Sequence, residues 1–197
     1  MKILITTDWY KPIVNGVVTS VLNLKKELEE RGHEVRVLTL SRDYHSYEED
    51  GVYYIKSVNL EKIYPNVRAV LPHREAYIQE LIQWNPDVVH SQCEFMTFSY
   101  AAKISRKCNC PLLHTYHTIY EDYLHYLPGT FFQYTKGAAL EKKMVAKFSK
   151  AVLKKTQQVI APTKKVEELL KNYEVSEPIS VIPTGIDLKR FQEILSK

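Results

Sequence analysis

The sequence is poor in cysteine and glycine and has no long apolar run. Its three cysteines, Cys93, Cys108 and Cys110, form no CxxC pair, which favours reduced thiols in a cytoplasmic protein over a disulfide framework. No run approaches the roughly 20 apolar residues that a membrane span needs. The first apolar run meets Asp8 early, which is typical of a first strand and not of a signal peptide.

Length and composition favour a globular domain with a core. The chain has 197 residues, of which 45% are apolar, so a disordered chain is excluded and one α/β domain is expected. The net charge of +4 is mild and does not by itself demand nucleic acid. No RNP-type or KH-type sequence is present, and we predict no nucleic-acid partner.

Apolar runs alternate with segments of helical spacing along the whole chain. Strands are predicted at residues 2–7, 34–40, 52–58, 88–90, 111–115, 157–161 and 179–182. Helices are predicted from residue 14 to the stop at Gly32, and at 73–84, 95–108, 137–155 and 163–172, while 42–50 is expected to be a loop. This alternation predicts an α/β fold with a doubly wound, Rossmann-like parallel sheet.

One stretch, LLHTYHTIYEDYLHY at residues 112–126, gathers histidines, carboxylates and tyrosines where a buried strand gives way to a helix. Ligands of open α/β sheets lie beyond the carboxyl ends of the strands, so we interpret this stretch as the floor of a binding or catalytic cleft. His117 is the candidate catalytic residue, because it follows the predicted strand directly. The alternative is a hydrogen-bonded structural histidine, which is the reading that we favour for His114.

Two other chemistries are open at this edge. His114, His117 and Glu121 would share one face of a helix and could hold a metal there, but Pro111 and the apolar LLHT favour a strand, so no metal is predicted. Cys93 near His90 could be a thiol nucleophile, although no positioned partner supports it.

Two further candidates follow the first strand. Asp8 could orient an acceptor hydroxyl or act as a base, and it could equally cap a helix or loop. Asn15-Gly16 could be a hairpin turn, but no alternating strand follows it. At the start of a helix, Gly16 would instead let backbone N–H groups approach a phosphate, although one glycine is far short of a G-x-G-x-x-G motif and could be a plain turn residue.

Basic residues form a stripe along the helix predicted at 137–155. Such a stripe is either a solvated face or a surface for anionic lipid, with apolar insertion added by the segment at 64–77. The membrane-surface candidates are Lys143, Lys147, Lys150, Lys154, Arg68 and Arg74.

Five segments together resemble the N-terminal domain of retaining GT-B glycosyltransferases of the family 4 type. They are KILITTDWYKPIVNGVVTSV, RGHEVRVLT, NPDVVHSQ, PLLHTYHTIYEDY and VIPTGIDLKRF. Among the members of this family, TYHTIYEDYLHY is most similar to the bacterial diacylglycerol glucosyltransferases. The resemblance implies two Rossmann domains with the active site between them, of which this chain is the first half.

The resemblance also implies roles for single residues. Asn15 and Gly16 would contact the donor diphosphate, and His117 would lie at the reacting sugar. Asp8, Tyr10 and Tyr116 would lie on the acceptor side, and no metal or other cofactor is implied. Residues 1–182 would be the acceptor-side domain and 183–197 the start of a linker to a C-terminal donor-binding domain.

The family's second domain carries two donor-binding glutamates eight residues apart, and no two glutamates here have that spacing. We therefore expect this chain alone to be inactive. The whole protein is expected to transfer a hexose from a nucleotide sugar to a membrane lipid such as diacylglycerol. Its expected location is the cytoplasm, peripheral on the inner face of the membrane. The alternatives are a soluble glycosyltransferase acting on a sugar or glycan, and a non-catalytic binding module.

Overall fold

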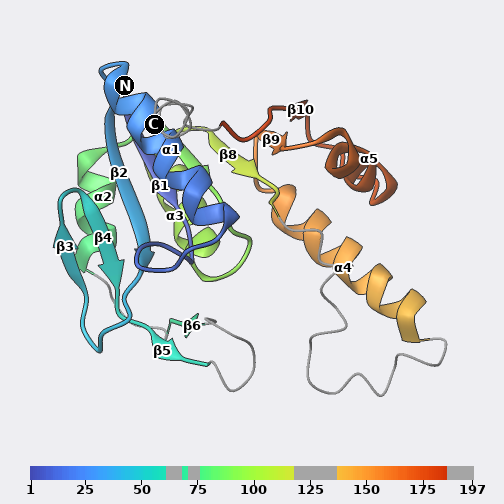
Figure 1. Cartoon of the computed structure of the whole chain (residues 1–197), viewed down its shortest axis with the longest axis horizontal. Coiled ribbons are helices and arrows are strands. Elements are labelled where there is room, and N and C mark those ends of the chain that lie inside the picture. The colour runs from blue at the N-terminus through green and yellow to red at the C-terminus, as the bar shows by residue number, and fades with distance from the viewer. Residues whose placement is uncertain (61–67, 71–75, 118–136, 186–197) are drawn as a thin grey trace, which may run out of the picture.

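The structure is a computed structural model that describes residues 1–60, 68–70, 76–117 and 137–185 (Figure 1). Within these residues, eight strands form the main sheet, in the order β10-β9-β8-β7-β1-β2-β4-β3. Its strands are β1 (Lys2–Thr6), β2 (Glu34–Leu40), β3 (Tyr47–Glu49), β4 (Val52–Ile55), β7 (Val88–Ser91), β8 (Leu112–Thr115), β9 (Gln158–Ala161) and β10 (Ile179–Val181). All pairings are parallel except that of β3 with β4, so the Rossmann-like fold is confirmed.

Helices cover both faces of this sheet. They are α1 (Gly16–Glu30), α2 (Ala76–Trp84), α3 (Met96–Cys108), α4 (Gly137–Leu153) and α5 (Lys164–Asn172). Side chains alternate along β1, so Leu4 packs in a core with α2 and α3, while Ile3 and Ile5 pack in a second core with α1. A third core joins α4 and α5 to β9.

The segment predicted as a loop at 42–50 contains a strand, β3, which corrects that prediction. Asp50 and Gly51 form the two-residue turn between β3 and β4, with φ of 50° and 75°. An Asp-Gly pair is a strong signal for such a hairpin, because both positions need positive φ. A small sheet of β5 (Val58–Asn59) and β6 (Arg68–Ala69) was also not predicted.

Helix α1 begins two residues later than the apolar pattern indicated. The Asn15 side chain accepts a hydrogen bond from the Val18 N–H at 2.8 Å and caps the helix, so Gly16 is its first residue. Val14, which the pattern placed on the buried face, is exposed. Val18 and Val21 are the buried residues of α1.

In helix α4, Met144 and Phe148 share the apolar spacing of Val152 in the sequence, but only Val152 is directed into the core. Ser149, Val152 and Leu153 are buried, whereas Met144 is 63% exposed and Phe148 is 41% exposed. The Phe148 ring stacks on Phe95 instead, with ring centroids 6.1 Å apart. An apolar patch of Phe95, Met144 and Phe148 therefore lies at the surface.

Candidate functional site

The candidate site lies where β1, β7 and β8 end, at the centre of the sheet. These strands are parallel neighbours, so the residues that follow them, Thr7-Asp8, Gln92-Glu94 and Tyr116-His117, meet at one edge. His90 and Thr115 lie on the same face of the sheet as Ile5, which is the face that α1 covers. His117 and Gln92 continue that alternation beyond the strand ends. The edge therefore brings the region of His117 to the side of the sheet where α1 begins.

His117 is partly buried and has a defined partner. Its Nε2 lies 2.6 Å from the Oε1 atom of Gln92. The pKa of His117 is lowered to about 4, chiefly by burial; the charge of Glu94 opposes this shift and His114 adds to it. The ring is therefore neutral at pH 7 and can both donate and accept a hydrogen bond.

The two neighbouring histidines are interior residues. His114 is fully buried, its Nε2 lies 3.1 Å from Glu94 Oε1, and its ring packs edge-on against Phe98. His90 Nε2 lies 2.8 Å from Thr115 Oγ1, and burial lowers the pKa of His90 to about 3. The structural interpretation of His114 agrees with this geometry.

Asp8 lies at the same edge, but its carboxylate is directed into the fold. Its oxygens accept hydrogen bonds from the N–H groups of Met96 and Thr97, at 3.0 and 2.8 Å, and from the Thr97 hydroxyl. Burial raises the pKa of Asp8, and the bonds from Thr97 oppose that rise. Of the two interpretations open from the sequence, the helix cap is the one that this geometry supports.

The start of α1 is open to a ligand. A Cβ atom placed on Gly16 would meet no atom within 4 Å. The first turn of α1 has no acidic residue, so the partial positive charge of the helix end is not neutralised there. The Asn15 side chain caps the helix, which leaves backbone N–H groups as the anion donors at this point.

The tyrosines predicted on the acceptor side are core residues in this domain. Tyr116 is fully buried, and its hydroxyl lies 2.9 Å from Ser149 Oγ, which contradicts an acceptor contact by this side chain. Tyr10 is 7% exposed, and its ring packs edge-on against Tyr54. Tyr10 remains near the edge through its position after β1, but its ring is used in packing.

The thiol and metal alternatives find no support in these contacts. Burial raises the pKa of the Cys93 thiol, and its Sγ lies 3.6 Å from Thr7 Oγ1, so it lacks the exposed, electropositive setting of a reactive cysteine. In the described part of the chain, no three histidine, cysteine, aspartate or glutamate side chains form a cluster that could hold a metal. Glu121 lies outside the described residues.

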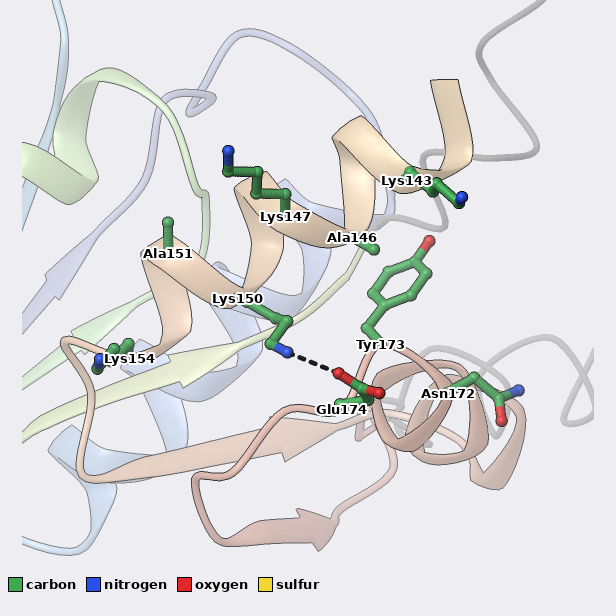
Figure 2. A pocket seen from close by; sticks show the side chains of 9 residues that line it. All are labelled: Lys143, Ala146, Lys147, Lys150, Ala151, Lys154, Asn172, Tyr173 and Glu174. Atoms are coloured by element: carbon green, nitrogen blue, oxygen red, sulfur yellow. Dashed lines mark hydrogen bonds and ion pairs between the residues drawn. The ribbon is translucent and has the colours of Figure 1, made fainter. Parts of the chain in front are cut away.

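The lysines lie along a shallow groove between α4 and α5 (Figure 2). The groove measures about 460 Å³, and its lining residues are Lys143, Ala146, Lys147, Lys150, Ala151, Lys154, Asn172, Tyr173 and Glu174. Lys150 forms an ion pair with Glu174 at 3.0 Å, whereas Lys147 extends away from Tyr173 (Figure 2). The positive charge along α4 is therefore partly compensated on the side facing α5.

Arg68, which was predicted for a membrane surface, does not join this stripe. Arg68 donates to the Ser57 hydroxyl at 2.6 Å and to the carbonyls of Ser57 and Arg42, so it ties the small sheet to the end of β2. These hydrogen bonds give Arg68 a structural use within the domain. Val70, predicted as part of an inserting segment, packs against the core, and Arg74 lies outside the described residues.

The sequence interpretation missed Gln92 and Glu94. Both follow β7, and their side chains are buried against His117 and His114 respectively. The polar run HSQCE at the end of a buried strand was the signal, since polar side chains buried there need hydrogen-bond partners at the same edge of the sheet.

Comparisons with known proteins agree with this geometry. Residues 14–190 match the Glycosyltransferase Family 4 domain. The chain is 36% identical over 193 residues to the alpha-monoglucosyldiacylglycerol synthase of Streptococcus pneumoniae, covering 98% of this chain and 42% of that protein. It is 34% identical over 193 residues to the Acholeplasma laidlawii protein of the same name, covering 97% of this chain and 48% of the other. The chain thus spans about half the length of these relatives.

Solved structures share the fold at low identity. The HepE protein of Anabaena, solved in complex with UDP-glucose, has a TM-score of 0.58 at 13% identity, covering 100% of this chain and 50% of its own. A sucrose-phosphate synthase structure from Thermosynechococcus elongatus has a TM-score of 0.54 at 15% identity, covering 100% of this chain and 96% of its own.

Proposed function

Because this chain belongs to glycosyltransferase family 4, we propose that the whole protein transfers a hexose from a nucleotide sugar to a membrane lipid such as diacylglycerol. The relatives at 34 and 36% identity are named for a glucosylated diacylglycerol, which supports this acceptor class. A structural neighbour holds UDP-glucose, which supports a nucleotide-sugar donor. The proposal includes retention of the anomeric configuration and catalysis without a bound metal ion.

Two observations support the proposal: the open helix start at Gly16 and the neutral imidazole of His117, which belong to the segments that follow β1 and β8. The leaving diphosphate gains negative charge during transfer, and backbone N–H groups at Gly16 can stabilise it. His117, held by Gln92, can form a hydrogen bond with the sugar. Asp8 is left out of the reacting set, because its carboxylate caps α3.

The membrane contact that we propose is the outer face of α4. It combines the exposed Phe148 and Met144 with the lysine stripe, and Phe95 adds to the apolar patch. An apolar patch flanked by lysines suits the interface of an anionic bilayer, where each lysine contributes about 1 kcal/mol. No helix in the described residues is long and apolar enough to cross a membrane.

A transfer assay with the whole protein tests the catalytic part. We expect His117→Ala to lower the rate of glucose transfer from UDP-glucose to diacylglycerol in mixed vesicles by about 100-fold or more. The exposed His45 gives the matched control, and His45→Ala should retain the wild-type rate. A near-normal rate in His117→Ala refutes the catalytic assignment. The anomeric configuration of the product tests retention, and the same assay in EDTA tests independence from metal.

Vesicle sedimentation tests the lipid acceptor against a soluble one. Reversing the charges of Lys143, Lys147 and Lys150 should weaken salt-sensitive binding to anionic vesicles. Reversal of Lys103, Lys164 and Lys171 is the matched control, since Lys171 pairs with Glu167 as Lys150 pairs with Glu174. Absence of vesicle binding by the wild type would favour a soluble glycosyltransferase. Nucleotide binding without any transfer would favour a non-catalytic module.

The isolated chain is the subject of a further test. We propose that residues 1–182 form the acceptor-side domain and that residues from 183 lead toward a donor-binding domain. The Asn23 amide donates to the Gly185 carbonyl at 3.0 Å, which holds this exit against α1. Turnover of a nucleotide sugar by the 197 residues alone would contradict the proposal that a second domain is needed to bind the donor.

A further inference from the structure

Gln92 and His117 form a contact that the sequence did not anticipate. Gln92 is 2% exposed, and its Oε1 lies 2.6 Å from His117 Nε2, a short distance for a hydrogen bond between nitrogen and oxygen. An amide oxygen can only accept. With the Gln92 amide in this orientation, Nε2 carries the hydrogen and Gln92 is the acceptor.

The protonation state of the other ring nitrogen, Nδ1, follows from the charge of the His117 ring. The buried ring titrates far below pH 7, so at neutral pH it carries a single proton. The titratable groups around it are Glu94, which favours the charged ring, and His114 and His90, which couple to it. With that proton on Nε2, the Nδ1 atom has a free lone pair.

The position of Nδ1 allows a ligand to use this lone pair. Among the described residues, His117 has one hydrogen-bond partner, Gln92, and it is bonded through Nε2. The His117 side chain is only partly buried, so a ligand can reach the ring.

We propose that Gln92 is a positioning residue that fixes the Nε2–H tautomer of His117, so that His117 accepts a hydrogen bond from a hydroxyl of the donor sugar. The identity of that hydroxyl as part of a sugar rests on the proposed function. Gln92 then decides which partner donates in the hydrogen bond between His117 and the sugar hydroxyl. In the other tautomer Nδ1 would carry the proton and could only donate to the hydroxyl. A sugar analogue in which fluorine replaces this hydroxyl cannot donate, and it should react about tenfold more slowly or worse.

Nitrogen-15 NMR of the imidazole rings tests the tautomer without any assay of transfer. In the wild-type chain at pH 7, we expect His117 Nε2 to be protonated and Nδ1 to show the shift of an unprotonated ring nitrogen. A His117→Gln variant identifies the resonance among the seven histidines. A protonated Nδ1 in the wild type refutes the proposal, even if the protein transfers sugar normally.

Kinetics of two Gln92 variants in the whole protein test the consequence. In Gln92→Glu the carboxylate favours the charged ring, so the pH at which kcat/KM falls on the acid side should rise by at least about one unit. In Gln92→Met the tautomer is free, and kcat/KM should fall about tenfold with no such rise. Gln83→Met, at an exposed position, is the control and should behave as wild type.

The two variants also separate positioning from plain structural support. A merely structural role would lower the melting temperature of both variants and leave the acid limb of kcat/KM unmoved, which would overturn the proposal. If either variant fails to fold, the wild-type NMR result decides alone. If no transfer is found at all, the proposed function fails while the tautomer result still stands on its own measurement.

Discussion

Asp8 and Thr97 are joined by two hydrogen bonds across 89 positions of the sequence, from the Thr97 N–H and from its hydroxyl to Asp8 Oδ1. Helix α3 begins after Phe95, whose side chain makes no cap hydrogen bond. The Asp8 carboxylate, coming from the end of β1, supplies that cap. A residue that sequence spacing made a candidate base thus holds the central strand to the helix beneath it.

We predict that Asp8→Ala lowers the free energy of unfolding by about 1–2 kcal/mol, because the N–H groups of Met96 and Thr97 lose their acceptor. Asp8→Asn keeps one acceptor oxygen and should cost less. Urea denaturation measures both, with Asp43→Ala as an exposed control. An Asp8→Ala protein as stable as wild type would contradict the cap. In the whole protein, Asp8→Asn should retain transfer.

We predict that His90 makes the fold sensitive to acid. Its pKa is about 3 in the folded chain and near 6.5 in the unfolded chain. Between these values the unfolded state binds a proton that the folded state does not, so the free energy of unfolding falls as pH falls from 6.5. The slope from one such group approaches about 1.4 kcal/mol per pH unit.

Replacement of His90 by glutamine should flatten this dependence. Urea midpoints at pH 7 and pH 5 provide the measurement, and His45→Gln serves as the exposed control. The wild type should lose more stability between the two pH values than His90→Gln does. Equal losses would show that the ring is not kept neutral by burial. His117 should contribute in the same direction, since its pKa is also lowered.

Tyr116 and Ser149 should show energetic coupling. Their hydroxyls lie 2.9 Å apart and both side chains are buried, so removing one hydroxyl leaves the other without its partner. We expect Tyr116→Phe and Ser149→Ala each to cost about 1 kcal/mol or more, and the double variant to cost less than their sum. Additive losses in a denaturation cycle would argue against the bond.

Arg68 should affect stability and leave vesicle binding unchanged. Arg68→Met removes hydrogen bonds to Ser57 and Arg42 that hold the small sheet, which we expect to cost about 1–3 kcal/mol. Arg106→Met, at an exposed position of α3, is the control. Weaker binding to anionic vesicles in a folded Arg68→Met protein would instead support a membrane role for Arg68.

The local pattern of apolar residues was sufficient to predict the strands of the parallel part of the sheet. Strands covered on both faces are nearly continuous apolar runs, as in KILIT of β1 and EVRVLTL of β2, and such runs are hard to mistake. The cap of α5 is likewise a local contact, because the Thr163 hydroxyl accepts from the Val166 N–H three residues later. Strand β3 was missed because its residues, YEE, carry no apolar alternation.

Long-range partners were the part that the sequence could not supply. The cap of α3 comes from Asp8, and the acceptor for His117 comes from Gln92, 25 positions earlier. On α4, Met144 and Phe148 have the apolar spacing of a core face, but the helix turns a face with Ser149 inward, where Tyr116 needs a hydroxyl. Which face of a helix is buried depends on the side chains of the sheet against which it packs. The spacing of residues within that helix does not contain this information.

The place of β1 in the sheet bears on how the chain is made. Strand β1 lies between β2 and β7, both of which follow it in the sequence, and its second edge is paired only when Ile3 meets Val88. Until then the nascent sheet has an unpaired apolar edge, which is a site for misassociation or chaperone binding. During synthesis this edge of β1 therefore stays exposed to misassociation until the residues around Val88 have been made and can pair with it.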